Sequence, residues 1–200
     1  HGREDLYRSL FSTVPPDSEA RYAALLARRE APLQAALGRL SAAHGQQHGM
    51  LVADVLALEG VLPIIGGTGF DILINNSAGP AGGALLGAHD DQLLDVFRQH
   101  VLGNQQLVRA IVPGMQSRQW GRIVNIISTS VKEPITMLGV SNTIRGAVAS
   151  WAKTLAGELA ADGITVNNVL PGYTRTQRLE QILKERAAAT GKSEENIAAA

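Results

Sequence analysis

The chain has 200 residues, 45% of them hydrophobic and 18% charged, a balance that is typical of a packed globular domain and excludes a disordered chain. Its 18 basic and 18 acidic residues cancel, so we expect neither nucleic acid nor a membrane as a partner. Without Cys the chain has no disulfide, thiolate nucleophile or Cys-ligated metal; its five His residues show no metal-ligand spacing, and a cytoplasmic location is expected.

Regular patterning starts near residue 21. Residues 1–20 form an irregular segment in which only 10–14 resemble a short strand. Beyond it, short apolar runs with few polar interior residues alternate with segments of helical periodicity, as a sheet covered on both faces requires. These runs predict strands at 22–27, 50–54, 70–75, 122–127 and 164–170.

Helices are predicted between these strands, near 33–40, over 90–115 and over 142–160. The 90–115 helix takes its apolar positions from Leu94, Phe97, Val101 and Val108. The 142–160 helix has one continuous apolar stripe, made by Ile144, Val148, Trp151, Leu155 and Leu159. Gly60 and Pro63 are expected to restrict any helix between residues 54 and 71, and 66–69 is interpreted as an ordinary helix-to-strand connection. The alternation predicts an α/β fold with a doubly wound parallel sheet.

Three segments resemble the short-chain dehydrogenase/reductase family, in matching order and spacing. They are DILINNSAG at 71–79, GRIVNIIS at 121–128 and GITVNNVLPGYT at 163–174. The resemblance runs from about residue 21 to residue 200 and implies a single Rossmann-type domain over 1–200. It also implies an oxidoreductase that transfers hydride between NAD(P) and a small-molecule carbonyl or secondary alcohol.

The resemblance assigns cofactor contacts to residues at the carboxyl ends of the predicted strands, where ligands bind in open α/β sheets. These residues are Asp54, Val55, Asn76, Ser77, Ala78, Gly79, Pro171, Gly172, Thr174 and Thr176. Arg28 and Arg29 follow the strand where such enzymes choose their cofactor, and arginine there favours the 2′-phosphate of NADP, with NAD as the alternative. The other interpretation is that Arg28 and Arg29 are two solvated charges at the start of a helix.

The sequence departs from the family in its missing glycine loop. Gly2 is the only glycine before Gly38, so the usual first strand and its phosphate-binding turn are not found, and neither is a closing strand near residue 200. Since that first strand would be central, its loss predicts a gap between the strands at 22–27 and 70–75. We expect that the chain shown here omits part of a longer one; the alternative is that 10–14 fills the gap.

The second departure concerns the catalytic group, which in the family is Asn, Ser, Tyr and Lys. Ser128 matches the serine, but Ser141 stands at the tyrosine position, Arg145 at the lysine position and His100 at the asparagine position. Ser141 and Arg145 are also predicted to contact the cofactor. A serine hydroxyl is a poor proton donor, and arginine stays charged and cannot relay a proton as lysine can.

Two residues offer replacement proton donors. His100 could shuttle protons, or it could be a buried histidine bonded to a backbone carbonyl. Tyr173 could supply a phenol or merely pack in its turn. The sequence therefore leaves two functions open: an enzyme with a non-standard site, or an inactive relative that acts as a binding or assembly module. By resemblance alone, a homodimer or homotetramer is expected.

Overall fold

The computed structural model describes residues 22–40, 42, 47–172 and the single positions 183, 184, 187, 191, 193 and 196. It divides into two compact units, His1–Val61 and Leu62–Ala200. The suggested strand at 10–14 lies outside the described residues. The prediction of one domain over 1–200 stays a prediction.

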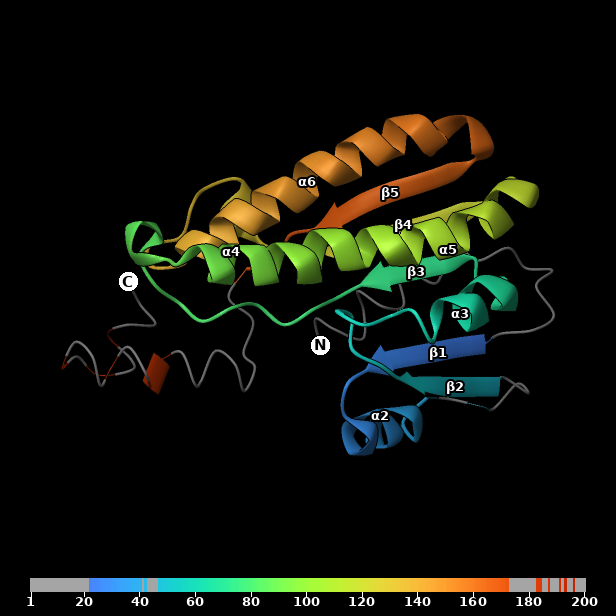
Figure 1. Ribbon diagram of the computed structural model, residues 1–200, viewed down its shortest axis with the longest axis horizontal. Helices are drawn as coiled ribbons and strands as arrows, with labels where there is room; N and C mark the ends of the chain where they lie inside the picture. Colours follow the sequence, from blue (N-terminus) through green and yellow to red (C-terminus); the bar gives the residue numbers. More distant parts are fainter. Residues whose placement is uncertain are drawn as a thin grey trace. The chain divides into compact units, whose positions relative to one another are not determined.

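The first unit contains one parallel strand pair (Figure 1). Strand β1, Tyr22–Ala27, and strand β2, Gln47–Val52, are joined by helix α2, Glu30–Leu37, which packs on both. Strand β2 starts three residues before the predicted 50–54 run, because its first residues pair through the backbone with β1 and need no apolar side chains. Helix α2 ends at Leu37, short of the predicted residue 40.

The second unit contains a three-stranded parallel sheet in the order β3-β4-β5. Its strands are β3, Ile72–Asn75, β4, Gly121–Ile126, and β5, Ile164–Val169, close to the predicted runs. Among the described residues, these three strands form one sheet and the β1–β2 pair forms another. The gap between the strands at 22–27 and 70–75 stays a prediction.

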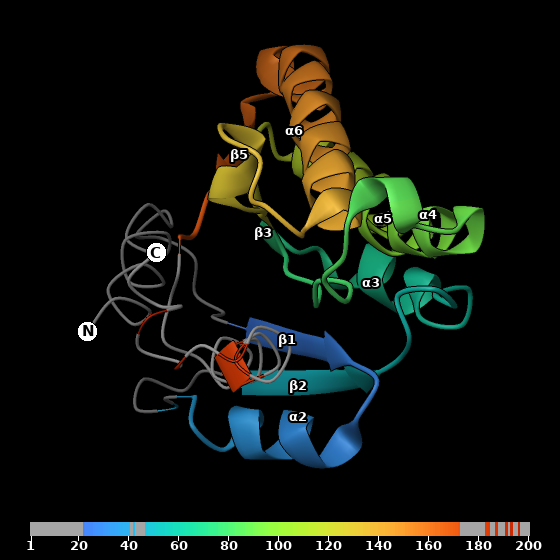
Figure 2. The same ribbon diagram turned by 90° about the vertical axis from the view of Figure 1, so that its left-hand side faces the viewer.

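The helices of the second unit lie on one side of its sheet. Figure 2 shows α4, α5 and α6 gathered on the same side of β3 and β5. Two successive right-handed crossovers in one direction require this arrangement. The helical elements are α3, Leu62–Thr68, η1, Leu85–Gly87, α4, Asp90–Phe97, η2, Arg98–Leu102, α5, Gly103–Ser117, η3, Thr129–Val131, α6, Gly139–Leu159, and η4, Ala160–Asp162.

Helix α3, with seven residues, fits the expectation that Gly60 and Pro63 restrict the helix before β3. Pro63 is the second residue of α3, where its missing N–H is not needed by the helix. Gly66, interpreted as part of a connection, instead lies inside α3, where a Cβ would come within 3.1 Å of the Ala110 carbonyl oxygen on α5. The small residue therefore allows a close helix–helix approach.

The predicted 90–115 helix forms, but with a π-helical segment, η2, between α4 and α5. Of its four apolar positions, Val101 and Val108 are buried, whereas Leu94 and Phe97 are 49% and 37% exposed. The buried residue of α4 is Val96, which packs in one cluster with Val101 of η2 and with Ile144 and Val148 of α6.

Helix α6 confirms its predicted stripe. Ile144, Val148, Leu155 and Leu159 are buried, and Trp151 is half-buried with its indole Nε1–H donating to Gln105 Oε1 at 2.7 Å. The stripe packs on β5 and on the π segment. This packing fixes the start of α6 near the ends of the strands.

A glycine substitution tests the turn after α6. Gly163 has φ +69°, and a Cβ there would collide with the Gln119 carbonyl oxygen, so Gly163→Ala should lower the free energy of unfolding by about 1–2 kcal/mol or more. Gly157, inside α6, has nothing within 4 Å of its Cβ position, so Gly157→Ala should instead raise that free energy by about 0.5–1 kcal/mol. Urea unfolding of both variants measures the difference, and equal effects would contradict it.

Candidate active site

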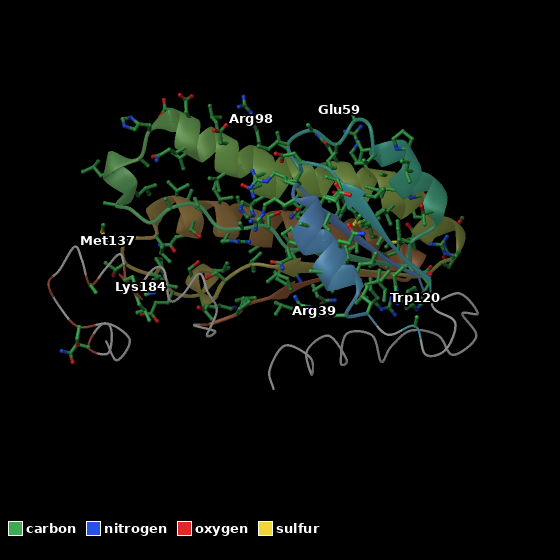
Figure 3. The ribbon with its side chains drawn as sticks, turned by 90° about the horizontal axis from the view of Figure 1, so that it is seen from below. Arg39, Glu59, Arg98, Trp120, Met137 and Lys184 are labelled. Carbon is green, nitrogen blue, oxygen red and sulfur yellow. The ribbon has the colours of Figure 1, made fainter. Side chains whose placement is uncertain are left out.

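The candidate site lies where the three strands of the second unit end. Because β3, β4 and β5 are parallel, their carboxyl ends meet at one edge of the sheet. In Figure 3, Met137, which precedes α6, and Trp120, which precedes β4, mark opposite ends of this unit. The predicted residues after β3, β4 and β5 therefore share the edge that carries Met137.

Ser128 follows β4 and caps the short helix η3. Its Oγ accepts a hydrogen bond from the Ser130 N–H at 3.1 Å, in extended backbone with φ −162°. Next to it, the Thr129 N–H donates to the Pro171 carbonyl oxygen at 3.3 Å. Ser128 and the residue after β5 thus lie side by side, as the sequence predicted. The bond from Ser130 uses a lone pair of Oγ and leaves its O–H proton for another acceptor.

Arg145 is buried in α6 and reaches two strand ends. Its Nη1 donates to the Ile126 carbonyl oxygen at 2.8 Å, and its Nη2 donates to the Ser77 carbonyl oxygen at 3.4 Å. Burial lowers the pKa of Arg145 from its ordinary value. The guanidinium therefore joins the end of β4 to the turn formed by residues 76–79, called the 76–79 turn below.

His100 binds the same turn from the π segment η2. Its side chain is 2% exposed, and its Nε2 lies 3.1 Å from the Ala78 carbonyl oxygen, which Gln99 Nε2 also approaches at 3.4 Å. Burial foremost, and then the positive charge of Arg145, lower the pKa of His100 from 6.5 to about 4. At neutral pH the ring is uncharged, and this contact is the carbonyl-bonded alternative that the sequence left open for His100.

The pKa of His100 gives a stability prediction. The unfolded chain binds a proton at His100 more tightly than the folded protein does. The contribution of the uncharged His100 to stability is therefore fully present above pH 6.5, and it is lost as the pH falls from 6.5 toward 4. We expect protonation of His100 to lower the free energy of unfolding by about 3 kcal/mol over that pH range, at about 1.4 kcal/mol per pKa unit. Urea unfolding of the native protein and of His100→Gln at pH 7, 5.5 and 4 measures the difference. Identical pH dependence of the two proteins would contradict the prediction.

Ser141 lies in the first turn of α6 and is half-buried. The start of this helix is held by an exchange of backbone bonds, in which Gly83 N–H donates to Met137 O at 2.7 Å and Gly139 N–H donates to Gly83 O at 3.0 Å. Arg145, four residues later, lies on the same face of α6 as Ser141. The helix thereby brings the Ser141 backbone to the same edge as the buried guanidinium.

In the first unit, the predicted selectivity residues follow β1 and β2. Arg28 Nη1 lies 3.9 Å from Asp54 Oδ2, and Asp54 Oδ1 accepts the Leu56 N–H at 3.0 Å. Asp54 is thus occupied within its own turn, next to the half-buried Val55. Arg29 is exposed at the start of α2 and caps it without a side-chain hydrogen bond.

A comparison with known families decides what this arrangement belongs to. The family model described as short chain dehydrogenase matches residues 17–187. The chain belongs to the short chain dehydrogenase family. The resemblance stated from three motifs is therefore confirmed, and with it the Rossmann-type α/β class.

Individual short chain dehydrogenases resemble the chain over most of its length. The 3-oxoacyl-(acyl-carrier-protein) reductase of Vibrio harveyi is 28% identical over 160 residues, which are 78% of this chain and 65% of that protein. L-sorbose reductase from Gluconobacter frateurii, solved with NADPH and L-sorbose, has 27% identity and a TM-score of 0.77, covering 87% of this chain and 68% of that one. NAD⁺-bound xylitol dehydrogenase has 26% identity and a TM-score of 0.74, covering 83% and 66%. The chain spans about half the length of the curated relatives it matches, with shares between 41% and 65%.

A row of asparagines is a feature of this short chain dehydrogenase that we did not predict. Asn75, Asn125 and Asn168 are register partners on β3, β4 and β5. Asn75 Nδ2 donates to Asn125 Oδ1 at 2.9 Å, and Asn125 Nδ2 donates to Asn168 Oδ1 at 3.1 Å. The sequence signal is an apolar run followed by Asn in each of the three strands. The row ties the strands together just before the site.

Some predicted positions lie outside the described residues, namely Tyr173, Thr174 and Thr176. Within the described ranges, no three His, Asp or Glu side chains gather where they could hold a metal ion. None of the helices in those ranges has the length and apolar content needed to cross a membrane.

Proposed function

We propose that this short chain dehydrogenase is an NAD(P)-dependent oxidoreductase that interconverts a small-molecule carbonyl and a secondary alcohol. The observation that carries the proposal is the hydrogen bonding of Ser128 at the end of β4. Its Oγ accepts the Ser130 N–H, so its own O–H is available to donate to a substrate oxygen. A donor fixed in this way at the sheet edge stabilises the charge that develops on a carbonyl oxygen during reduction.

The second hydroxyl is that of Ser141. A serine hydroxyl is a weak acid, so we propose that Ser141 Oγ passes a solvent proton to the substrate oxygen while Ser128 holds that oxygen. Neither Arg145 nor His100 moves a proton in this proposal. Both are buried against backbone carbonyls, and His100 has a pKa of about 4. We therefore propose no proton transfer by His100, assign Arg145 no such role, as its permanent charge predicted, and keep Ser128 and Ser141.

The described residues fit part of a nicotinamide nucleotide. Ala78 and Gly79 are exposed in the 76–79 turn, and their N–H groups have no partner among the described residues. Two successive free N–H donors suit hydroxyl or phosphate oxygens. Asn76 and Ser77 from the same turn, and Pro171 and Gly172 after β5, complete the proposed nucleotide contacts. The bound cofactor supplies the hydride.

NADP is the proposed cofactor and NAD the alternative. Arg29 is exposed beside the end of β1 and is free of the 3.9 Å ion pair that engages Arg28. An exposed arginine after this strand suits a 2′-phosphate. L-sorbose reductase, solved with NADPH, supports this choice, whereas NAD⁺-bound xylitol dehydrogenase supports the alternative. We further propose that Thr174 and Thr176 contact the nicotinamide end.

The substrate and the assembly are proposed at a coarser level. The similar proteins named above act on an oxoacyl thioester carrier, a sugar and a polyol by name, so the shared chemistry is a C=O or CH–OH group. The half-exposed Met137 and the apolar Leu85 and Leu86 nearby favour an apolar portion in the substrate. Exposed Leu94 and Phe97 on α4 favour a homodimer or homotetramer built on that helix.

The competing proposal is an inactive relative that serves as a binding or assembly module. It is favoured by the serine and arginine at positions 141 and 145, where the family has tyrosine and lysine. The two proposals differ in whether nucleotide is used.

A nucleotide titration tests them. We expect the full chain to bind NADPH with micromolar affinity, seen as a rise in nicotinamide fluorescence, and to bind NADH at least tenfold more weakly. Arg29→Ala should remove most of that preference, while Arg39→Ala, an exposed arginine beyond α2, should not. No binding at millimolar NADPH or NADH would reject the enzyme; binding without turnover of any ketone or alcohol would favour the module.

A further inference from the structure

Two carbonyl groups of the 76–79 turn are bound by side chains from different helices. The Ser77 oxygen accepts from Arg145 Nη2 on α6, and the Ala78 oxygen faces His100 Nε2 on η2. The ladder of β3 ends at Asn75, so these oxygens have no strand partner. Arg145 also binds the Ile126 oxygen at the last residue of β4. Buried backbone carbonyls require such partners.

These contacts determine where the neighbouring N–H groups point. A trans peptide unit places its C=O and its N–H on opposite sides. The oxygens of Ser77 and Ala78 point toward Arg145 and His100, so the N–H groups of Ala78 and Gly79 point away from them. Both N–H groups are the unpartnered, exposed donors described above. The buried pair thus turns two adjacent donors outward.

We propose that Arg145 and His100 are positioning residues that hold the 76–79 turn with the Ala78 and Gly79 N–H donors aimed at the nucleotide. This inference rests on the proposed function for the identity of the ligand. The uncharged imidazole is suited to the task, because it donates one N–H without adding a second charge beside the guanidinium. Arginine is suited as well, because its planar fork reaches two carbonyls at once, which a lysine ammonium on one flexible stem does not match.

The role makes a counterintuitive prediction about Arg145→Lys. That substitution restores the residue type of the family, so a catalytic deficit at this position would be repaired by it. A positioning role predicts the reverse, since an ammonium must reach Ile126 O and Ser77 O from a single nitrogen, whereas the guanidinium binds them from two. We expect Arg145→Lys to weaken NADPH binding about tenfold without raising turnover.

The experiment compares four variants of the full chain with the native protein. His100→Phe removes the donor and keeps the ring, and His100→Gln keeps an N–H donor near the Nε2 position. Arg145→Lys is the third variant, and Arg98→Met, which removes an exposed arginine of η2, is the control. NMR order parameters of the Ala78 and Gly79 N–H vectors report the turn, and NADPH titration reports the affinity. All measurements are made well below each variant's unfolding temperature, so that a loss of global stability does not contribute.

We expect order parameters of about 0.85 at Ala78 and Gly79 in the native protein, His100→Gln and Arg98→Met, and values below about 0.6 in His100→Phe and Arg145→Lys. NADPH affinity should fall about tenfold in the latter two and stay within threefold in the others. Native-like order in His100→Phe, lost order with unchanged affinity, or tighter binding by Arg145→Lys would each overturn the inference. If the native protein binds no nucleotide while the order parameters change as expected, the proposed function is wrong, but the inference that Arg145 and His100 position the 76–79 turn is supported.

Discussion

Replacing Ser141 with tyrosine should raise the turnover of carbonyl substrates by about 10²-fold or more, the usual size of a positioned general acid. A phenol has a pKa near 10, far closer to neutrality than that of a serine hydroxyl, and Ser141 occupies the position where the family resemblance places tyrosine. The start of α6 already holds this residue at the strand ends. Steady-state oxidation of NADPH with a panel of ketones measures the effect.

The matched control for this prediction is Ser141→Phe, which adds the ring without the hydroxyl. It should leave turnover at or below the native rate. Equal gains in the phenylalanine and tyrosine variants would show that the ring acts by packing, and no gain in either would show that proton donation does not limit the reaction.

The second large effect is expected from Ser128→Ala, which should lower kcat by about 10²–10³-fold, as loss of one preorganised donor to a developing oxyanion does. The affinity for NADPH should change little, because Ser128 is proposed to bind the substrate oxygen. The variant also loses the cap of η3, which accepts the Ser130 N–H and is worth about 1 kcal/mol of stability. Stopped-flow measurement of hydride transfer separates the rate of the chemical step from binding.

Ser150→Ala, on the exposed part of α6, is the control for general effects of removing a serine hydroxyl. It should retain native kcat. If Ser128→Ala also retains native kcat, the proposed role of Ser128 is wrong, regardless of the result of the nucleotide titration.

Much of the second unit was predictable because its signals are local. The strands at 72–75, 121–126 and 164–169 are apolar runs, and the stripe of α6 repeats at helical spacing, so pattern alone located them. The extent of helix α3 over residues 66–68 was missed because glycines there indicate a connection. Its formation depends on Pro63 standing in the first turn and on the contact of Gly66 with α5, which is a tertiary effect.

The candidate site was predictable in its positions but less so in its contacts. The order of the motifs located Ser128, Arg145 and His100, because the carboxyl ends of parallel strands must meet. The partners of Arg145 and His100 are the backbone carbonyls of Ile126, Ser77 and Ala78, and a carbonyl is present at every residue, so no sequence pattern distinguishes these three. The burial that lowers the pKa of His100 is likewise a property of the assembled helices.

The π segment η2 has a consequence for any shortened version of this helix. Removing one residue from Arg98–Leu102 would allow regular α-helical winding, and each residue along such a helix advances the rotation by about 100°. Because a π turn accommodates one extra residue in a single turn, that removal would leave the downstream part, with Gln105 facing the Trp151 indole, close to its present orientation. Removing a residue from the regular helix α4 would instead rotate the helix on one side of the deletion by about 100° relative to the other. A shortening by a single amino acid should therefore be tolerated better within η2 than in the regular helix on either side of it.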